Sequence, residues 1–390
     1  MTLRDDTHLA RAGAAPEFET RPSSPPVYLT TAFDLEDVSQ LDQITSGAAS
    51  GYLYTRDGNP NHAAFANDLA LLERADEATV CSSGMGALTA TLAALGRAGD
   101  HIVAGRVLYG RTGQLLQHFA SHFGLEVTFV DATKAEDVAA AIRPATKLCL
   151  VESLTNPLLE VTDLPAIRQA IGEVPLLVDA TFVTPILQKP LEFGATLVWH
   201  SGSKYLNGHG DVMLGAIAGP SALIRKIRGM VSLYGTNANP FECWLASRGM
   251  RTLGLRMQRV TTSATRIANW LAQQSTVLRV NHPSLASHPT HEVAQRVLPQ
   301  GTGGMLSFDL PGGRPAVDAL FRRLAESIPF SPTLADARTT FSYPAATSHK
   351  FMTAAERAAC GIGDGLVRLS VGLEDPNDLI EELTTGLAAS

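Results

Sequence analysis

The stretch PLLVDATFVTPILQKPLEFGATLVWHSGSKYLNGHGD, residues 175–211, decides the fold class. It holds two short apolar runs, PLLVDA (175–180) and TLVWHS (196–201), and each run ends in small or polar residues. Short runs of Val, Leu and Trp bounded by Gly and Pro predict buried strands. Polar residues directly after such strands indicate a ligand crevice at the carboxyl ends of a parallel sheet.

The same pattern continues upstream along the chain. The runs HIVAG (101–105), LEVTFVD (125–131) and KLCLVES (147–153) read as strands, and RTGQLLQHFASHF (111–123) reads as a helix between them. The stretch EATVCSS (77–83) is a further strand-like run that leads into a helical pattern. Alternating strands and helices predict parallel strands joined by crossover helices, and therefore a mostly parallel α/β fold.

Three segments with different patterns divide the chain. The proline-rich RPSSPP (21–26) cannot form a helix or a central strand and predicts an extended N-terminal arm over 1–60. A large α/β domain is expected over 61–245. After LGAIAG (214–219) the pattern changes to long helices and then to a few strands such as GGMLSFDL (303–310), which predicts a smaller α+β domain over 246–390.

Composition excludes several classes of protein. The chain has 390 residues, with 31 Lys and Arg against 38 Asp and Glu, and no basic run. A net charge of -7 gives nucleic-acid binding no electrostatic support, so a small molecule is the expected partner. The four cysteines form no CxxC pair and predict neither a zinc site nor disulfides. Residues 1–15 resemble no secretory signal and no apolar run is long enough to cross a membrane, so we expect a cytoplasmic protein.

Chemistry is concentrated at HSGSKYLNGHGD (200–211). Lys204 follows a strand end among small and hydroxylic residues, which suits a desolvated lysine that forms a covalent link to a carbonyl cofactor. Upstream, Asp179 ends the apolar run PLLVD, where a buried acid needs a cationic partner such as a pyridinium nitrogen. Taken alone, Lys204 could be a loop lysine and Asp179 a helix cap or turn residue.

A third signal is an anion site. CSSGMGA (81–87) runs from a strand through a glycine turn into a helix, which aims backbone amides at a group such as phosphate. Ser201 and Ser203 flank Lys204 and offer hydroxyls to the same phosphate, although either could form only a local turn. Together these signals favour pyridoxal 5'-phosphate (PLP). A nicotinamide-dependent enzyme would share the strand and helix pattern, but the chain has no GxGxxG fingerprint.

The chain resembles the Cys/Met-metabolism family of PLP-dependent enzymes, which includes cystathionine synthases and lyases, methionine gamma-lyase and homoserine sulfhydrylases. The resemblance covers nearly the whole chain. It rests on blocks in the family's order: YLYTRDGNP (52–60), SSGMGA (82–87), LYGRT (108–112), VESLTNP (151–157), VDATFVTP (178–185), HSGSKYLNGHGD (200–211), RGMRTLGLRM (248–257) and GDGLVRLSVGLEDPNDLI (363–380). It implies an aspartate aminotransferase-like, fold type I PLP-dependent transferase with a mostly parallel sheet and a smaller C-terminal α+β domain.

The resemblance also implies a role for each matching residue. Lys204 and Tyr109 are the catalytic pair: Lys204 holds the cofactor and moves the α proton, while Tyr109 stacks on the ring and assists proton transfer. The remaining cofactor contacts are Asp179 at the ring nitrogen, Thr181 and Asn156 beside the ring, and Gly84, Met85, Ser201 and Ser203 at the phosphate. Glu152 supports the strand end. Without the resemblance, Tyr109 would read as a core aromatic and Asn156 as a turn residue.

Two further expectations concern the neighbouring subunit and the substrate. Tyr54 and Arg56 match the pair that reaches the phosphate of the neighbouring subunit's cofactor, since a guanidinium suits bidentate phosphate binding. The active unit is then at least a homodimer, and we expect a homotetramer. Arg368 matches the arginine that grips the substrate's α-carboxylate. Without the resemblance, Arg368 would be interpreted as an arginine in a strand with no role in substrate binding.

The chain departs from the family at several positions. Ala180 stands where the family has Asn, Asn61 where it has Thr, Thr333 where it has Ser, and Arg338 where a Glu is common. The chain looks closest to the methionine gamma-lyase branch, but Arg111 replaces that branch's cysteine after the tyrosine. Arg111 either adds positive charge at the distal end of the substrate or points to solvent. We therefore include Thr333 and Arg111 with Arg368 among the candidate substrate-binding residues.

These features predict gamma-elimination or gamma-replacement on a sulfur-containing or homoserine-derived amino acid. Beta-elimination, as in a cystathionine beta-lyase, is the alternative, and the product separates them because the first gives 2-oxobutanoate and the second pyruvate. A catalytically silent PLP-binding protein with the same fold is a more distant possibility. The sequence leaves open which side chain is eliminated and what Arg111 and Arg338 do.

Overall fold

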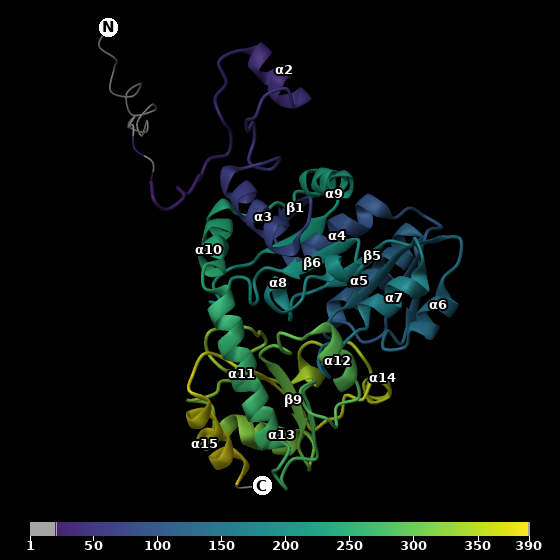
Figure 1. Cartoon of the computed structure of the whole chain (residues 1–390), viewed down its shortest axis with the longest axis vertical. Coiled ribbons are helices and arrows are strands. Elements are labelled where there is room, and N and C mark those ends of the chain that lie inside the picture. The colour runs from purple at the N-terminus through teal and green to yellow at the C-terminus, as the bar shows by residue number, and fades with distance from the viewer. Residues whose placement is uncertain (1–19, 21, 389–390) are drawn as a thin grey trace.

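The structure is a computed structural model that describes residue 20 and residues 22–388. Figure 1 shows two bodies, an upper one built on a large sheet and a lower one built on a smaller sheet, with the N-terminal segment extending away from the upper body. Both sheets were expected from the alternating pattern of the upstream half and from the strands after residue 300.

The large sheet has seven strands in the described part of the chain. Its strands are β1 (Glu77–Cys81), β2 (His101–Gly105), β3 (Glu126–Val130), β4 (Thr146–Glu152), β5 (Leu176–Asp179), β6 (Leu197–Ser201) and β7 (Gly215–Gly219), arranged in the order β1-β7-β6-β5-β4-β2-β3. Neighbouring strands from β6 to β3 are parallel, whereas β7 runs antiparallel to both β6 and β1. The predicted mostly parallel α/β sheet is confirmed.

Helices cover both faces of this sheet. On one face, α4 (Gly84–Leu95), α5 (Gly110–Phe123) and α9 (Ser221–Tyr234) bury leucines and isoleucines against alternate residues of the strands. On the other face, α6 (Ala135–Ala141) and α7 (Leu164–Ile171) pack on Val103, Val151 and Val178. Because successive strand residues point to opposite faces, strands buried on both sides read as continuous apolar runs in the sequence.

The smaller sheet lies in the lower body. Its strands β8 (Arg279–Asn281), β9 (Met305–Asp309), β10 (Thr340–Ser342) and β11 (Leu366–Ser370) are antiparallel in the order β10-β11-β9-β8. Three helices pack around this sheet, namely α11 (Leu253–Leu271), α13 (Arg314–Arg323) and α15 (Pro376–Leu387). The expected smaller C-terminal α+β unit is confirmed.

One continuous apolar cluster joins the two bodies. It includes Phe65 of α3 (Pro60–Glu73), Val198 of β6, Val260 of α11 and Phe308 of β9, all nearly inaccessible to solvent. The shorter elements of the chain are α8 (Thr184–Leu187), α10 (Pro240–Met250), α12 (His291–Val297) and α14 (Ala354–Ala359), with the 3-10 turns η1 (Pro190–Phe193) and η2 (Pro344–Ala346). A shared core fixes the cleft between the two sheets.

The predicted domain boundaries stay predictions. The boundary near residue 245 lies within α10, which packs against α3 of the upper body. The region of long helices expected after residue 219 includes α10 and α11, which are separated by a break at Arg251 and Thr252. The first buried strand of the smaller sheet follows only at Arg279.

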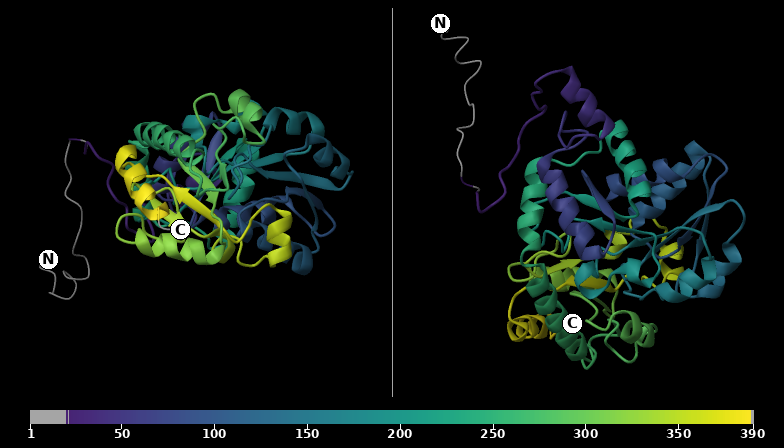
Figure 2. Two further views of the ribbon diagram at one scale, coloured as in Figure 1. Left: turned by 90° about the horizontal axis from the view of Figure 1, so that it is seen from below. Right: turned by 45° about the horizontal axis from the view of Figure 1, so that its top comes forward.

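Part of the arm projects from the body. Its helix α2 (Val38–Ser46) has no buried residue and is the purple helix at the top of the right-hand view of Figure 2. Close to the body, the Trp244 indole N–H donates to the Pro25 carbonyl (2.7 Å). Residues 1–19 and 21 of the expected arm lie outside the described residues.

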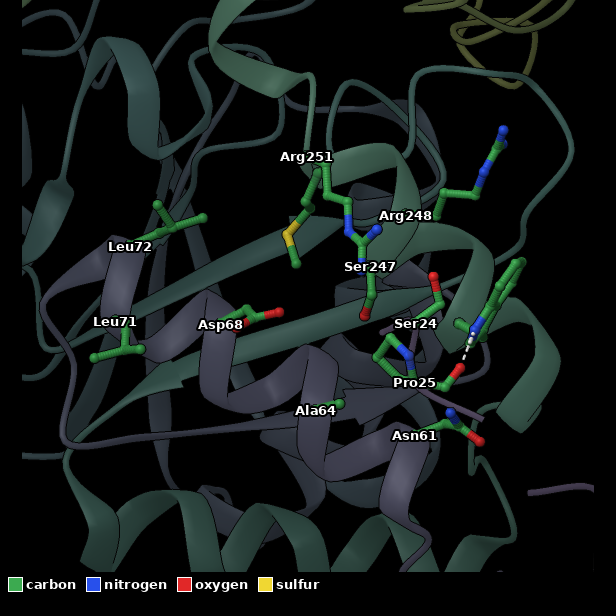
Figure 3. A pocket seen from close by; sticks show the side chains of 12 residues that line it. Ser24, Pro25, Asn61, Ala64, Asp68, Leu71, Leu72, Ser247, Arg248 and Arg251 are labelled. Carbon is green, nitrogen blue, oxygen red and sulfur yellow. Dashed lines mark hydrogen bonds between the residues drawn. The ribbon is translucent and has the colours of Figure 1, made fainter. Parts of the chain in front are cut away.

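A cavity of about 420 Å³ lies where the arm crosses α3 and α10 (Figure 3). Ser24 and Pro25 come from the arm, Asp68 and Leu71 from α3, and Arg251 from the end of α10. Burial raises the pKa of Asp68, and the charge of Arg251 lowers it in part. This cavity has no lysine in its lining, unlike the cleft described next.

Candidate active site

A cavity of about 600 Å³ opens at the carboxyl ends of β4, β5 and β6. The N-terminus of α4 and the loop after β6 close one side, while residues 332–334, residues 346–350 and β11 close the other. This is the edge where open α/β sheets bind ligands. The predicted site residues Gly84, Met85, Tyr109, Arg111, Asn156, Asp179, Thr181, Ser201, Ser203, Lys204, Thr333 and Arg368 all line it.

Lys204 lies in the loop between β6 and β7, with its amine directed across the cleft. Its Nζ donates to the Thr333 hydroxyl (3.0 Å), which comes from the C-terminal half of the chain. Burial, and to a smaller extent the nearby charge of Arg368, lowers the pKa of Lys204 to about 8. A substantial fraction of this amine is therefore neutral, and nucleophilic, just above neutral pH.

Asp179 and Glu152 form the acidic floor of the cavity. They are register partners at the ends of the neighbouring strands β5 and β4. Asp179 accepts hydrogen bonds from the Thr181 backbone N–H (2.9 Å) and from the Thr181 hydroxyl. Glu152 accepts from the backbone N–H groups of Tyr109 (2.6 Å) and Asn156 (3.1 Å).

Burial raises the pKa of both carboxyl groups. The pKa of Glu152 lies well above its usual range, first because of burial and then because of the charge of Asp179. The two Thr181 hydrogen bonds lower the pKa of Asp179 in part. Asp179 is therefore the member of the pair that carries the negative charge, and Glu152 holds the proton.

An anion cradle lies at the start of α4. The Ser83 hydroxyl accepts from the Gly86 N–H (3.0 Å), while the N–H groups of Gly84 and Met85 belong to the first turn and have no partner within the helix. The indole N–H of Trp199 donates to the Gly84 carbonyl (2.8 Å) and ties this turn to β6. A side chain at position 84 would approach Ser201 Cβ to 3.0 Å, so a glycine is required for this close approach.

The two serines beside the lysine differ in their contacts. The Ser201 backbone N–H donates to the Thr181 hydroxyl (2.9 Å), which places Ser201 beside the α4 turn. The Ser203 hydroxyl accepts from the Leu214 N–H (2.9 Å) and so also holds its own loop. Ser203 therefore stabilises its local turn, as the alternative interpretation expected, and its side chain also borders the cavity.

Arg368 reaches the cavity from β11. It is 3% exposed, and its Nη1 donates to the Asn156 side-chain oxygen (2.7 Å). Burial lowers the pKa of Arg368 to about 10, so it is still a cation at neutral pH. In the described part of the chain it forms no ion pair, and its Nε is buried without a hydrogen-bond partner. A buried cation without a carboxylate indicates a site for a carboxylate ligand.

Tyr109 and Arg111 lie at the N-terminus of α5, at the mouth of the cavity. Tyr109 is 39% exposed, and its ring is not part of an apolar cluster, so the core-aromatic alternative does not hold. The guanidinium of Arg111 lies 4.3 Å from the centroid of the Phe351 ring and donates to the Gln114 side chain (3.1 Å).

Two predicted site residues, Tyr54 and Arg56, do not line this cavity, and neither does Arg338, whose role the sequence leaves open. Tyr54 and Arg56 precede α3, are both exposed, and contact each other, with the Arg56 guanidinium 5.2 Å from the Tyr54 ring centroid. Arg338 donates to the Glu326 and Ser327 carbonyls at the surface of the lower body.

Several residues of the site were not predicted. Trp199 precedes Ser201 by two positions on β6, so the period of two already places both on one face of the sheet. Phe182 follows Asp179 and Thr181 directly and also borders the cavity. Ser348 and Lys350 come from a loop after η2 whose sequence carries no pattern that would place it at the cleft.

The residues present fit PLP. Asp179 is buried at the cavity floor and forms no ion pair with another described residue, so a ring cation would supply its missing partner. Lys204 is a partly desolvated amine, and the free amides of the α4 turn offer a phosphate cradle. The fold and this arrangement are those of a PLP-dependent enzyme.

Comparison with known proteins gives the family. The model of the family Cys/Met metabolism PLP-dependent enzyme matches residues 6–388, so this chain belongs to that family. It is 41% identical to the L-methionine gamma-lyase of Porphyromonas gingivalis over 93% of this chain and 92% of that protein. It is 37% identical to the O-succinylhomoserine sulfhydrylase of Pseudomonas aeruginosa over 98% of this chain and 95% of that protein.

A solved structure agrees with this assignment. The cystathionine gamma synthase from Xanthomonas oryzae pv. oryzae, in complex with aminoacrylate and cysteine, superposes with a TM-score of 0.88 at 36% identity, covering 94% of this chain and 92% of that chain. PLP is thus the cofactor of this protein, which is a PLP-dependent lyase or transferase.

Among the described residues, no helix is both long and apolar enough to cross a bilayer, and no group of three His, Cys, Asp or Glu could hold a metal ion. The four cysteines form no disulfide. Three of them are buried, and Cys360 is half-buried.

Proposed function

We propose that this enzyme catalyses gamma-elimination or gamma-replacement on a sulfur-containing or homoserine-derived amino acid. The observation that carries the proposal is the convergence of Lys204, Asp179 and Arg368 on one cavity. The relatives named above act on such amino acids according to their names, and the chain spans nearly their whole length.

When bound, PLP supplies a ring that stabilises negative charge at the substrate's α-carbon. Asp179 would hold the ring nitrogen and the α4 turn the phosphate, and Thr181 keeps Asp179 oriented through its hydroxyl. Asn156 lies between the ring position and Arg368 and fixes the guanidinium through their hydrogen bond.

The substrate's α-carboxylate would be held by Arg368, whose planar donors suit a bidentate contact. This contact places the α-carbon next to Lys204, whose amine takes the α proton and then returns it as a general acid. Thr333 accepts a hydrogen bond from that amine and limits its movement. The Tyr109 hydroxyl, at the mouth of the cavity, would assist departure of the γ substituent.

We further propose that the active unit is at least a homodimer and forms a homotetramer in the cytoplasm. Tyr54 and Arg56 lie outside the cavity of their own chain and are exposed, which suits a role at the cofactor phosphate of a neighbouring subunit. The arm presents Leu29 and Val38 with about 70% of each residue exposed, and apolar surface of this kind suits burial against a second copy.

The first test is the absorption spectrum of the purified protein with and without Lys204→Ala, followed by addition of cystathionine, methionine and an O-acylhomoserine. We expect a visible band that depends on Lys204, and 2-oxobutanoate as product. Pyruvate as the main product would establish beta-elimination instead. A Lys204-dependent band without turnover of any substrate would identify a silent PLP-binding protein.

A further inference from the structure

The mouth of the cavity carries two cations on one aromatic ring. The Arg111 guanidinium lies 4.3 Å and the Lys350 Nζ lies 5.0 Å from the centroid of the Phe351 ring. Arg111 comes from the first turn of α5, whereas Lys350 and Phe351 come from the loop after η2. Two segments distant in sequence therefore place positive charge on one small patch of the rim, and the side chains of both Arg111 and Lys350 border the cavity.

These two charges have no carboxylate partner. Neither Arg111 nor Lys350 forms an ion pair with another residue of the described part of the chain. Among the described residues, the acids that line the cavity are Glu152 and Asp179, which lie at its floor and are held by Tyr109, Asn156 and Thr181. Positive charge thus dominates the rim, and negative charge is confined to the floor.

The positions also separate two carboxylate sites. Arg368 is buried and fixed by Asn156 inside the cavity, where it suits the α-carboxylate that every amino acid carries. Arg111 and Lys350 are exposed at the rim, where only a long side chain could reach them. A neutral substituent such as a methyl thioether would gain nothing from two hydrated cations.

We propose that Arg111 and Lys350 form a subsite for a carboxylate at the far end of the substrate's side chain. The preferred substrates are then amino acids whose γ substituent ends in a carboxylate, such as the succinyl ester of homoserine. This inference rests on the proposed function, and it names Arg111, which stands where the methionine gamma-lyase branch has a cysteine, as a specificity residue. Phe351 keeps both cations in place through cation–π contacts.

The test compares two esters with the same reacting atoms. With purified holoenzyme, kcat/KM is measured for O-succinyl-L-homoserine and O-butyryl-L-homoserine, whose acyl groups have the same number of carbons and differ in that a methyl group replaces the distal carboxylate. We expect the wild type to favour the succinyl ester by about tenfold or more, and the double variant Arg111→Gln/Lys350→Gln to lose that preference. Arg111→Lys, which keeps the charge, should retain part of it. Arg338→Gln, an arginine outside the cavity, should retain all of it.

A binding measurement separates this inference from the proposed reaction. Titration calorimetry on the same proteins uses 2-aminosuberate and 2-aminooctanoate, which have equal chain lengths, lack a γ leaving group and differ by the terminal carboxylate. Tighter binding of 2-aminosuberate that disappears in the double variant supports the subsite even if no ester is turned over, and in that case only the proposed reaction fails. Equal binding of both compounds, or a preference that survives the double variant, overturns the subsite.

Discussion

At the scale of single residues, the site depends on ionisable groups moved away from their usual pKa values by burial. Lys204 has its pKa lowered to about 8, so its neutral, nucleophilic fraction grows as the pH rises through that value. Asp179 carries the charge of the acidic pair, and Glu152 keeps the proton. At the same pH, the Lys204 amine can therefore act as a nucleophile and the Asp179 carboxylate can hold a cation.

This charge state predicts the pH dependence of cofactor capture. The rate at which apoenzyme binds PLP should rise about tenfold per pH unit below pH 8 and level off above it, because only the neutral Lys204 amine can react. Stopped-flow absorbance from pH 6.5 to 9.5 measures this, with free N-acetyl-lysine as the reference for the titration of PLP itself. A rate that still climbs steeply up to pH 9.5 would mean that Lys204 is not desolvated.

Arg368 gives a second prediction at this scale. Arg368→Lys keeps the charge but loses the planar pair of donors and the Asn156 contact, so KM for the amino acid should rise by at least about tenfold, or ~1.4 kcal/mol. Steady-state kinetics at several substrate concentrations gives KM and kcat separately. Arg338→Lys, at the surface, serves as the control and should leave both values within about twofold. A KM unaffected by Arg368→Lys would exclude the carboxylate role.

At the scale of elements, the N-terminus of α4 leaves little space for a side chain at position 84. Gly84→Ala would bring a Cβ to 3.0 Å from Ser201 Cβ and push the first turn of α4 away from the phosphate position. We expect the Kd for PLP to rise about tenfold or more, measured by fluorescence titration of apoenzyme. Gly113→Ala in α5, where an added Cβ meets nothing within 4 Å, is the matched control and should leave this Kd unchanged. Equal Kd values for both variants would mean that the phosphate of PLP does not bind at this turn.

The elements also show how much the sequence could predict. The strands β1, β2, β4, β5 and β6 were predictable because they are short apolar runs that are mostly buried, and β3 was predictable from its run of Val and Phe although it is only partly buried. The antiparallel direction of β7 was not predicted. Because parallel neighbours need a crossover of a dozen or more residues, usually a helix, the residues 202–214 between β6 and β7 could have indicated it, since they contain no helical pattern. The break between α10 and α11 was also missed, because Arg251 and Thr252 interrupt the helix without a proline.

The candidate site likewise contains residues that the sequence could predict and residues that it could not. Lys204, Asp179 and Gly84 were predictable because each follows or begins an element in a recognisable local pattern. The approach of Arg368 to Asn156 joins residues 212 positions apart and follows only from packing of the two bodies. The rim residues Lys350 and Phe351 lie in a loop, and nothing in their local sequence places them beside Arg111.

At the scale of the whole molecule, the lining of the candidate site does not include Arg56 of the same chain. Lys204, Asp179, Arg368 and Tyr109 converge on one cavity, whereas Arg56 lies outside it in the same chain. The protruding arm and its exposed apolar residues provide the surface through which a second copy could bring its own Arg56 to this cradle.

This arrangement predicts that two inactive variants restore activity when they share an oligomer. Arg56→Gln removes the cation donated to the neighbour, and Lys204→Ala removes the anchor of the chain's own site. In a mixed dimer, the site with Lys204 intact receives Arg56 from the other chain, while the second site lacks both groups. The doubly tagged mixed dimers should therefore have about half of the wild-type specific activity, because one of their two sites is complete. The measurement is the specific activity of co-expressed, differently tagged variants purified through both tags. Each variant purified alone is the control. A doubly tagged oligomer as inactive as those controls would mean that Arg56 acts at the site of its own subunit.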